Sequence, residues 1–206
     1  MKYGLIQKAM WGGFKGSFKK QLTQTLSESQ PKLVMKNAHK KYKEILAGLP
    51  EFDKGDKFVI NIVSCAMLSA VLLSVEKEYS VEDVRFFYRR AMCENPLMKL
   101  SGRKSSAYTV KGREKLKQRA KNSETCTNPY SWKFTVEDGE TINQYTATFY
   151  TCGICRLMGE LGLKKYIPAM CTLDYDMAAL NNTEFTREYT LAGGGEYCDC
   201  HYNHRV

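Results

Sequence analysis

The stretch Phe58–Val75, FVINIVSCAMLSAVLLSV, decides the fold. Nearly all of its residues are apolar or small, so it has no polar face of the kind that a surface helix needs. Its length would just allow it to cross a membrane. It is interrupted by four polar residues, however, and no second such segment follows: Asn61, Ser64, Ser69 and Ser74. We therefore predict a central helix that is buried on most sides.

Apolar residues at helical spacing continue on both sides of this segment. They predict helices over Lys32–Leu49, which ends at a glycine and a proline, and over Val81–Met92, which Ser80 can cap. The polar stretch Lys99–Lys121 predicts a loop followed by an exposed helix. Residues 1–125 therefore form the mainly helical part of the predicted fold.

The residue pattern of the sequence changes after Pro129, where threonine and aromatic residues begin to alternate with polar ones. The pattern predicts a short strand around Phe134, a strand over Thr141–Tyr150, helices over Cys152–Leu163 and Ile167–Leu180, and strands over Phe185–Leu191 and Glu196–Asn203 with a glycine turn between them. Residues 130–206 thus form the sheet-containing, cysteine-rich part. We predict one α+β domain over residues 1–206, with a helical N-terminal half packed on a small, mainly antiparallel C-terminal sheet.

The charge of the chain is clearly basic, at a formal +9 for 206 residues. The positive residues gather in 36–43 and 99–121, without an arginine-rich arm or an aromatic platform beside them. This pattern is typical of solvated helix faces, so we expect neither nucleic acid nor a membrane as a partner. The N-terminus lacks the apolar run of a secretory signal, which predicts a cytoplasmic protein with free thiols. The oligomeric state stays open.

Five of the eight cysteines lie in the last third of the chain, at Cys152, Cys155, Cys171, Cys198 and Cys200. The C-x-x-C of Cys152 and Cys155 falls where a strand meets a helix. It is compatible with a redox pair or with half of a metal site. No parallel β-α-β frame supports the first, and the spacing of the last two cysteines is not that of a zinc knuckle. We therefore assign no metal ligands and no cofactor, with a divalent metal as the alternative.

Charged residues accompany these thiols. Cys171 and Asp174 lie three residues apart and share a face of a helix. Arg187 shares a strand face with Phe185 and with two later residues, Tyr189 and Leu191. A charged residue among apolar ones usually pairs with a carboxylate, either from the protein or from a ligand. The residues therefore indicate a polar cluster that lines a ligand site, or a packed core with one ion pair.

Three segments of this region resemble the L-2-amino-thiazoline-4-carboxylic acid hydrolase family. They are YTCGICRLMGELGL at 150–163, MCTLDYDMA at 170–178 and FTREYTLAGGGEYCDCHY at 185–202. The family pattern falls on Cys155, Cys171, Asp174, Arg187, Thr190, Leu191, Gly194, Cys198 and Asp199. It does not cover Cys152, and at Cys200 the family more often has an aromatic residue. The resemblance therefore ranks these two thiols below the other three.

The resemblance implies a hydrolase that opens the ring of L-2-amino-thiazoline-4-carboxylate to N-carbamoyl-L-cysteine, with a substrate carboxylate as the group to be bound. It assigns catalytic roles to Cys155, Cys171, Asp174 and Cys198, and substrate binding to Arg187 and Asp199. Asp174 would act as a general base or hold the amidinium group, and one thiol would be the nucleophile. Two alternatives stay open: a non-catalytic ligand sensor related to vinyl-reductase-type domains, and a metal-binding regulator.

Overall fold

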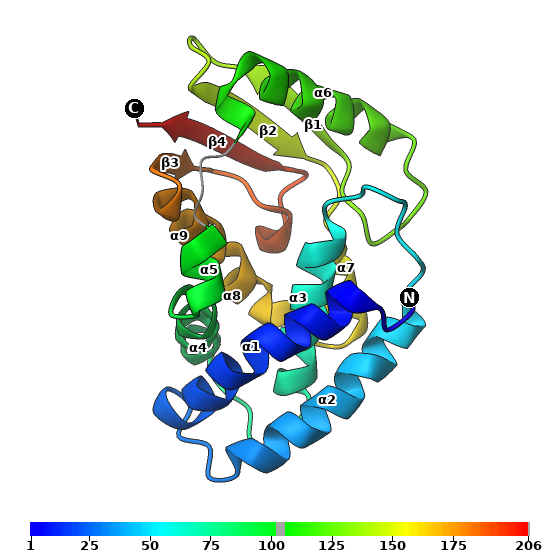
Figure 1. The fold of residues 1–206 in the computed structure, drawn as a ribbon, viewed down its shortest axis with the longest axis vertical. Helices are drawn as coiled ribbons and strands as arrows, with labels where there is room; N and C mark the ends of the chain where they lie inside the picture. The colour runs from blue at the N-terminus through cyan, green and yellow to red at the C-terminus, as the bar shows by residue number, and fades with distance from the viewer. Residues whose placement is uncertain (102–105, 206) are drawn as a thin grey trace.

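The computed structural model describes residues 1–101 and 106–205 and has an α+β fold, as predicted (Figure 1). A four-stranded antiparallel sheet lies at one end of the molecule, and helices from the N-terminal half fill the other end. Among the described residues, none of the helices combines the length and the apolar character needed to cross a bilayer.

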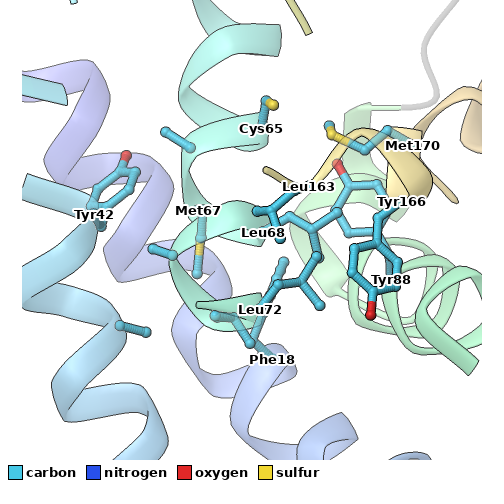
Figure 2. Packing of buried hydrophobic residues seen from close by; sticks show 14 of the residues in the cluster. Phe18, Tyr42, Cys65, Met67, Leu68, Leu72, Tyr88, Leu163, Tyr166 and Met170 are labelled. Carbon is cyan, nitrogen blue, oxygen red and sulfur yellow. The ribbon is translucent and has the colours of Figure 1, made fainter. Parts of the chain in front are cut away.

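Helix α3 (Val59–Leu72) is the centre of the molecule, and the prediction of a buried helix is confirmed. Every residue from 62 to 72 in it is buried. Figure 2 shows side chains of other elements converging on it: Phe18, Tyr42, Tyr88, Leu163, Tyr166 and Met170. Full burial of one large apolar side chain contributes roughly 1.5–3 kcal/mol. This packing is therefore the main source of stability in the helical part.

Helix α1 (Leu5–Gln24) was missed by the sequence prediction. Its buried aromatic and aliphatic residues, Trp11, Phe14, Phe18 and Leu22, do recur at helical spacing. The segment was not predicted as a helix because three glycines lie among these residues, and glycine is less favourable than alanine in a helix by about 1 kcal/mol. Tertiary contacts of α1 with α2, α3 and α4 override that local preference.

The other helices of this half agree with the predictions in position. They are α2 (Pro31–Gly48), α4 (Val81–Cys93) and α6 (Val110–Glu124). The expected N-cap of α4 is present, since Ser80 Oγ accepts the backbone N–H of Asp83 at 3.1 Å. The predicted loop within 99–121 contains two short helices instead, α5 (Pro96–Ser101) and η1 (Ser106–Tyr108), and residues 102–105 lie outside the described part.

The sheet has the order β1-β2-β4-β3, with β1 (Phe134–Asp138), β2 (Gln144–Phe149), β3 (Thr183–Thr186) and β4 (Cys198–His204). All neighbours are antiparallel. Helix α6 is fixed to the β1–β2 edge by Arg113, whose side chain is only 4% exposed. Its guanidinium donates to Asp138 Oδ1 at 2.8 Å and to two backbone carbonyls of the β1–β2 turn region.

Two predictions in the last third were wrong in detail. The helix expected over 167–180 is broken at Thr172 into α8 (Ile167–Cys171) and α9 (Leu173–Leu180). The strand expected over 185–191 is β3, which already ends at Thr186. It ends there because the Asp199 carboxylate accepts the backbone N–H groups of Glu188 and Tyr189, at 3.1 and 2.6 Å. These amides are therefore not free to extend the sheet.

Candidate functional site

The site begins where the chain leaves β2 and enters helix α7 (Gly153–Glu160). Cys152 is the N-cap residue of α7, with extended backbone angles. Gly153 follows it and passes so close to the chain that an added Cβ would lie 1.8 Å from the carbonyl oxygen of Tyr130. A side chain at this position would push the helix away. Glycine therefore allows the first turn of α7, and with it Cys152, to lie against α3 and the 130–132 segment.

The two thiols of the C-x-x-C differ in their ionisation. The pKa of Cys152 is lowered, chiefly because the Cys155 thiol donates to it. Burial opposes this shift, and the N–H groups of Cys155, Ile154 and the Trp132 indole support it, although the side chain makes no regular capping hydrogen bond. The pKa of Cys155 is raised by the same hydrogen bond and by burial. Cys152 is therefore the member of the pair that favours the thiolate.

The remaining thiols of the cluster favour the protonated form. Burial raises the pKa of Cys171 and of Cys200 to about 12. Burial also raises the pKa of Cys198, although its Sγ accepts the backbone N–H of Leu191 at 3.2 Å. Cys155 is close enough to Cys152, Cys171 and Cys198 for each to affect its titration. The structure thus brings the three predicted thiols together and adds Cys152 and Cys200 to them.

Asp174 and Arg187 form the charged part of the cluster. Arg187 Nη1 donates to Asp174 Oδ2 at 3.0 Å, and Nη2 donates to the carbonyl oxygen of Cys171 at 2.7 Å. The guanidinium also lies over the rings of Tyr175 and Phe185, and its side chain is 7% exposed. The expectation that Arg187 lies against Phe185 is therefore met, but with the strand ended at Thr186 it does not share a strand face with Tyr189 and Leu191.

The Asp174 carboxylate is the point at which this cluster meets solvent, since 54% of its side chain is exposed. The protein on its inner side still desolvates the carboxyl group and raises its pKa, while Arg187 opposes that shift. Burial alone would lower the pKa of Arg187, but Asp174 and Cys171 outweigh it and raise that pKa. The arrangement is an ion pair with one buried cation and one accessible anion.

Asp199 lies apart from the cluster, although the sequence grouped it with Arg187. It alternates with Cys198 and Cys200 along β4 and occupies the outer face of the sheet, where His201 Nε2 lies 3.2 Å from its Oδ2. Burial would raise its pKa, but the N–H groups of Tyr189 and Glu188 outweigh this and lower it. Its contacts fix the turn that directly follows Arg187. Substrate binding by Asp199 stays a prediction.

A family model matches residues 60–202, which is more than half of the chain and includes every residue of the cluster. The model describes L-2-amino-thiazoline-4-carboxylic acid hydrolases. The chain belongs to this family. No curated protein and no solved structure matches it. Membership of the L-2-amino-thiazoline-4-carboxylic acid hydrolase family is therefore the basis for inferring the function of this chain.

The cluster is packed and has one exposed edge at Asp174. Four hollows of the described surface, with volumes between about 380 and 520 Å³, contain none of the six predicted site residues. Within the described residues, no group of three or more His, Cys, Asp or Glu is arranged to hold a metal ion. All eight cysteines are free.

The structure places Cys152 and Trp132 at the cluster, although the sequence analysis ranked Cys152 below the other thiols and did not consider Trp132. The signal for Cys152 was present, because a C-x-x-C at the start of a helix places its first thiol beside free backbone N–H groups. The family pattern drew attention to Cys155 instead. Trp132 carried no such signal. Its indole reaches Cys152 across twenty residues of sequence, and the same ring stacks against Phe58 at 4.8 Å between ring centroids.

Proposed function

We propose that this protein hydrolyses a small cyclic amidine that carries a carboxylate, with L-2-amino-thiazoline-4-carboxylate as substrate and N-carbamoyl-L-cysteine as product. The observation that carries the proposal is the cluster of thiols around the Asp174–Arg187 pair, inside the segment that matches the hydrolase family. It combines a nucleophile class, an accessible carboxylate and a cation in one place, which is what this reaction needs.

The chemistry of the substrate suits these groups. The carbon to be attacked is bonded to two nitrogens and to the ring sulfur, so its protonated form is a planar amidinium cation. A carboxylate can accept two N–H groups of such a cation side by side. Asp174 is accessible and ionic, and it is already oriented by Arg187. We assign it to binding the amidinium and to accepting a proton when water adds, a role for which a raised pKa is favourable.

Arg187 has two roles in this proposal. It orients Asp174 through Nη1 and fixes the C-terminal end of α8 through the carbonyl of Cys171. It is also the cation nearest to the exposed edge of the cluster. A substrate carboxylate would bind it by sharing these donors or by displacing Asp174 from one of them. The carboxylate would then anchor the end of the ring opposite to the amidine.

The test is an assay of the purified full-length protein on the thiazoline, with and without added divalent metal, with product detected as a new free thiol. We expect turnover by the wild type. Asp174→Asn should reduce kcat by roughly 10²- to 10⁴-fold, the usual cost of losing an acid–base group. Asp176→Asn is the matched control: Asp176 lies on the same helix but pairs with Arg89, at 2.7 Å. Its turnover should stay within a few-fold of the wild type.

Absence of product under both metal conditions would overturn the proposal. Tight binding of the thiazoline without turnover would support the sensor alternative instead. A variant Asp174→Asn that is folded and as active as the wild type would remove Asp174 from the mechanism.

A further inference from the structure

We propose that the hollow beside the C-terminal end of α6 binds a small molecule that carries one carboxylate and a flat ring. In this proposal Arg119 holds the carboxylate, and the aromatic residues at the bottom of the hollow contact the ring. None of the predicted site residues lines this hollow. The inference is therefore independent of the proposed hydrolase function.

The hollow has the size of a ligand site. Its volume is about 400 Å³, and pockets for small ligands usually have roughly 300–1,000 Å³. Three segments enclose it: the loop of residues 53–58, the last turns of α6, and residues 131–134, which lead into β1. Figure 1 shows the loop before α3 beside the C-terminal end of α6. The hollow can therefore hold a molecule with a single ring.

The bottom of the hollow is aromatic. Phe58 and Trp132 stack with 4.8 Å between ring centroids, and Phe134 meets Phe58 edge-on at 5.5 Å. Trp132 and Phe134 are buried, so packing fixes their rings. Of the four hollows described above, this one alone is lined by more than one aromatic residue. Such a surface favours a flat ring, which can make offset-stacked or edge-on contacts with it.

The cation of the hollow is Arg119. Its guanidinium lies over the Phe58 ring, 5.6 Å from the centroid. Arg113 of the same helix pairs with Asp138, whereas Arg119 forms no ion pair among the described residues. The surrounding protein desolvates the guanidinium, and this lowers its pKa. A carboxylate would supply the missing anion, because a guanidinium can donate two parallel N–H groups to its two oxygens.

Asp56 does not supply that anion, although it opposes the shift in the pKa of Arg119. Its Oδ1 accepts the backbone N–H of Phe58 at 2.8 Å, and its Oδ2 accepts the hydroxyl of Ser131 at 2.6 Å. These two hydrogen bonds hold the carboxylate at the start of α3. The Asp56 side chain therefore shapes the hollow and leaves the guanidinium without a direct partner in the described part of the chain.

The charges around the hollow favour a ligand with a single negative charge. Three cations and two carboxylates line it: Lys54, Lys57, Arg119, Asp53 and Asp56. The formal excess is thus one positive charge, which one carboxylate balances. A phosphate group with two negative charges would exceed it and would meet both aspartates. Ligands with one carboxylate are therefore preferred over phosphates.

The first test uses the unmodified protein with benzoate as the probe. Cys126 is half-buried and lines the hollow, so a bound molecule should shield its thiol. Alkylation by iodoacetamide is timed with increasing benzoate and read by peptide mapping. We expect a saturable decrease of the Cys126 rate, with half of the effect on the order of 1 mM. Cys93, which is half-buried on α4, is the internal control, and its rate should not change.

Variants and other anions then test the two parts of the site. Arg119→Gln should weaken the protection of Cys126 by benzoate roughly tenfold or more, as loss of a charge-assisted contact does. Lys121→Gln is the matched control, because it removes the same charge from the same helix outside the hollow. It should protect within about twofold of the wild type. Acetate, which has no ring, should protect far less than benzoate, and phosphate should not protect.

The proposal is wrong if benzoate leaves the Cys126 rate unchanged, or slows Cys93 equally. Full protection in Arg119→Gln would remove the guanidinium from the site and overturn the proposal. Equal protection by acetate or by phosphate would overturn the ligand class. Selective protection of Cys126 that is lost in Arg119→Gln and kept in Lys121→Gln supports the proposal. None of these results bears on the hydrolase proposal, which the thiazoline assay decides.

Discussion

The middle of α3 and the first turn of α7 pack against each other. The pKa of the cysteine in α3 is nevertheless raised, while the pKa of the cysteine at the start of α7 is lowered. Cys65 lies in α3 with no exposed surface, and burial raises its pKa. Cys152 is close enough to Cys65 to affect it, but its own pKa is lowered by the donors around it. Neither the position in the sequence nor the residue type explains why the pKa values of these two cysteines shift in opposite directions. Their surroundings explain it, because a thiolate is stabilised by N–H and S–H donors and destabilised by apolar contacts.

The largest effect that should separate the two regions is on stability. Leu68→Ala removes a fully buried side chain from α3 and should lower the free energy of unfolding by about 2–5 kcal/mol. Ile60→Ala in the same helix is the control, since Ile60 is 52% exposed and should lose far less. Denaturant unfolding measures both. Equal losses would mean that α3 is not the centre of the core.

The next effect concerns the start of α7. Gly153→Ala places a methyl group on the carbonyl of Tyr130 and should cost about 1–3 kcal/mol as an overpacking change. It should also lower the reactivity of Cys152 by moving the first turn. The control is Gly159→Ala in the same helix, where nothing lies within 4 Å of the added Cβ. That change should stabilise the protein slightly, by about 0.4–1 kcal/mol. Two substitutions with the same sign would contradict this explanation.

The smallest expected effect is a shift of the pH dependence of Cys152 alkylation to lower pH. The groups that lower the pKa of Cys152 are the Cys155 thiol, the N–H groups of Cys155 and Ile154, and the Trp132 indole, while burial opposes them. Cys152 in turn raises the pKa values of Cys65, Cys171 and Cys198. Since the donors outweigh burial, alkylation of Cys152 by iodoacetamide should begin at a lower pH than that of an unstructured cysteine peptide.

Cys65 should stay unmodified in the folded protein over the same pH range. The lowered pKa of Cys152 also makes the stability of the fold depend on pH. The ionised thiolate of Cys152 contributes to the free energy of unfolding above the ordinary thiol pKa, and this contribution disappears as the pH falls through the lowered pKa. Peptide mapping after timed alkylation measures both thiols in one sample. Faster modification of Cys65 than of Cys152 would invert the comparison.

The sequence predicted the helical region far better than the cluster. Helix α3 could be found because its whole length is apolar, and α4 because Ser80 and its first acidic turn mark a start. These signals are local. Helix α1 was lost because glycines weakened an otherwise regular apolar spacing.

In the cluster, the decisive contacts join distant residues. The end of β3 depends on the carboxylate of Asp199, ten or more residues further along the chain, and the state of Cys152 depends on Trp132. Neither spacing nor propensity indicates the contact with Trp132, and the family pattern favoured Cys155 over Cys152. The pairing of Asp174 with Arg187 could be anticipated because a buried guanidinium requires an anion.

The Asp199 carboxylate connects the two sides of the sheet. It accepts amides of residues 188 and 189 from the outer face, while the preceding residue, Arg187, reaches inward to Asp174. A change at Asp199 or His201 would therefore shift the guanidinium without altering any side chain that faces the thiols. The guanidinium of Arg187 is thus coupled to the buried Asp199 and, through it, to the exposed His201, so a library restricted to residues that face the thiols would miss both positions.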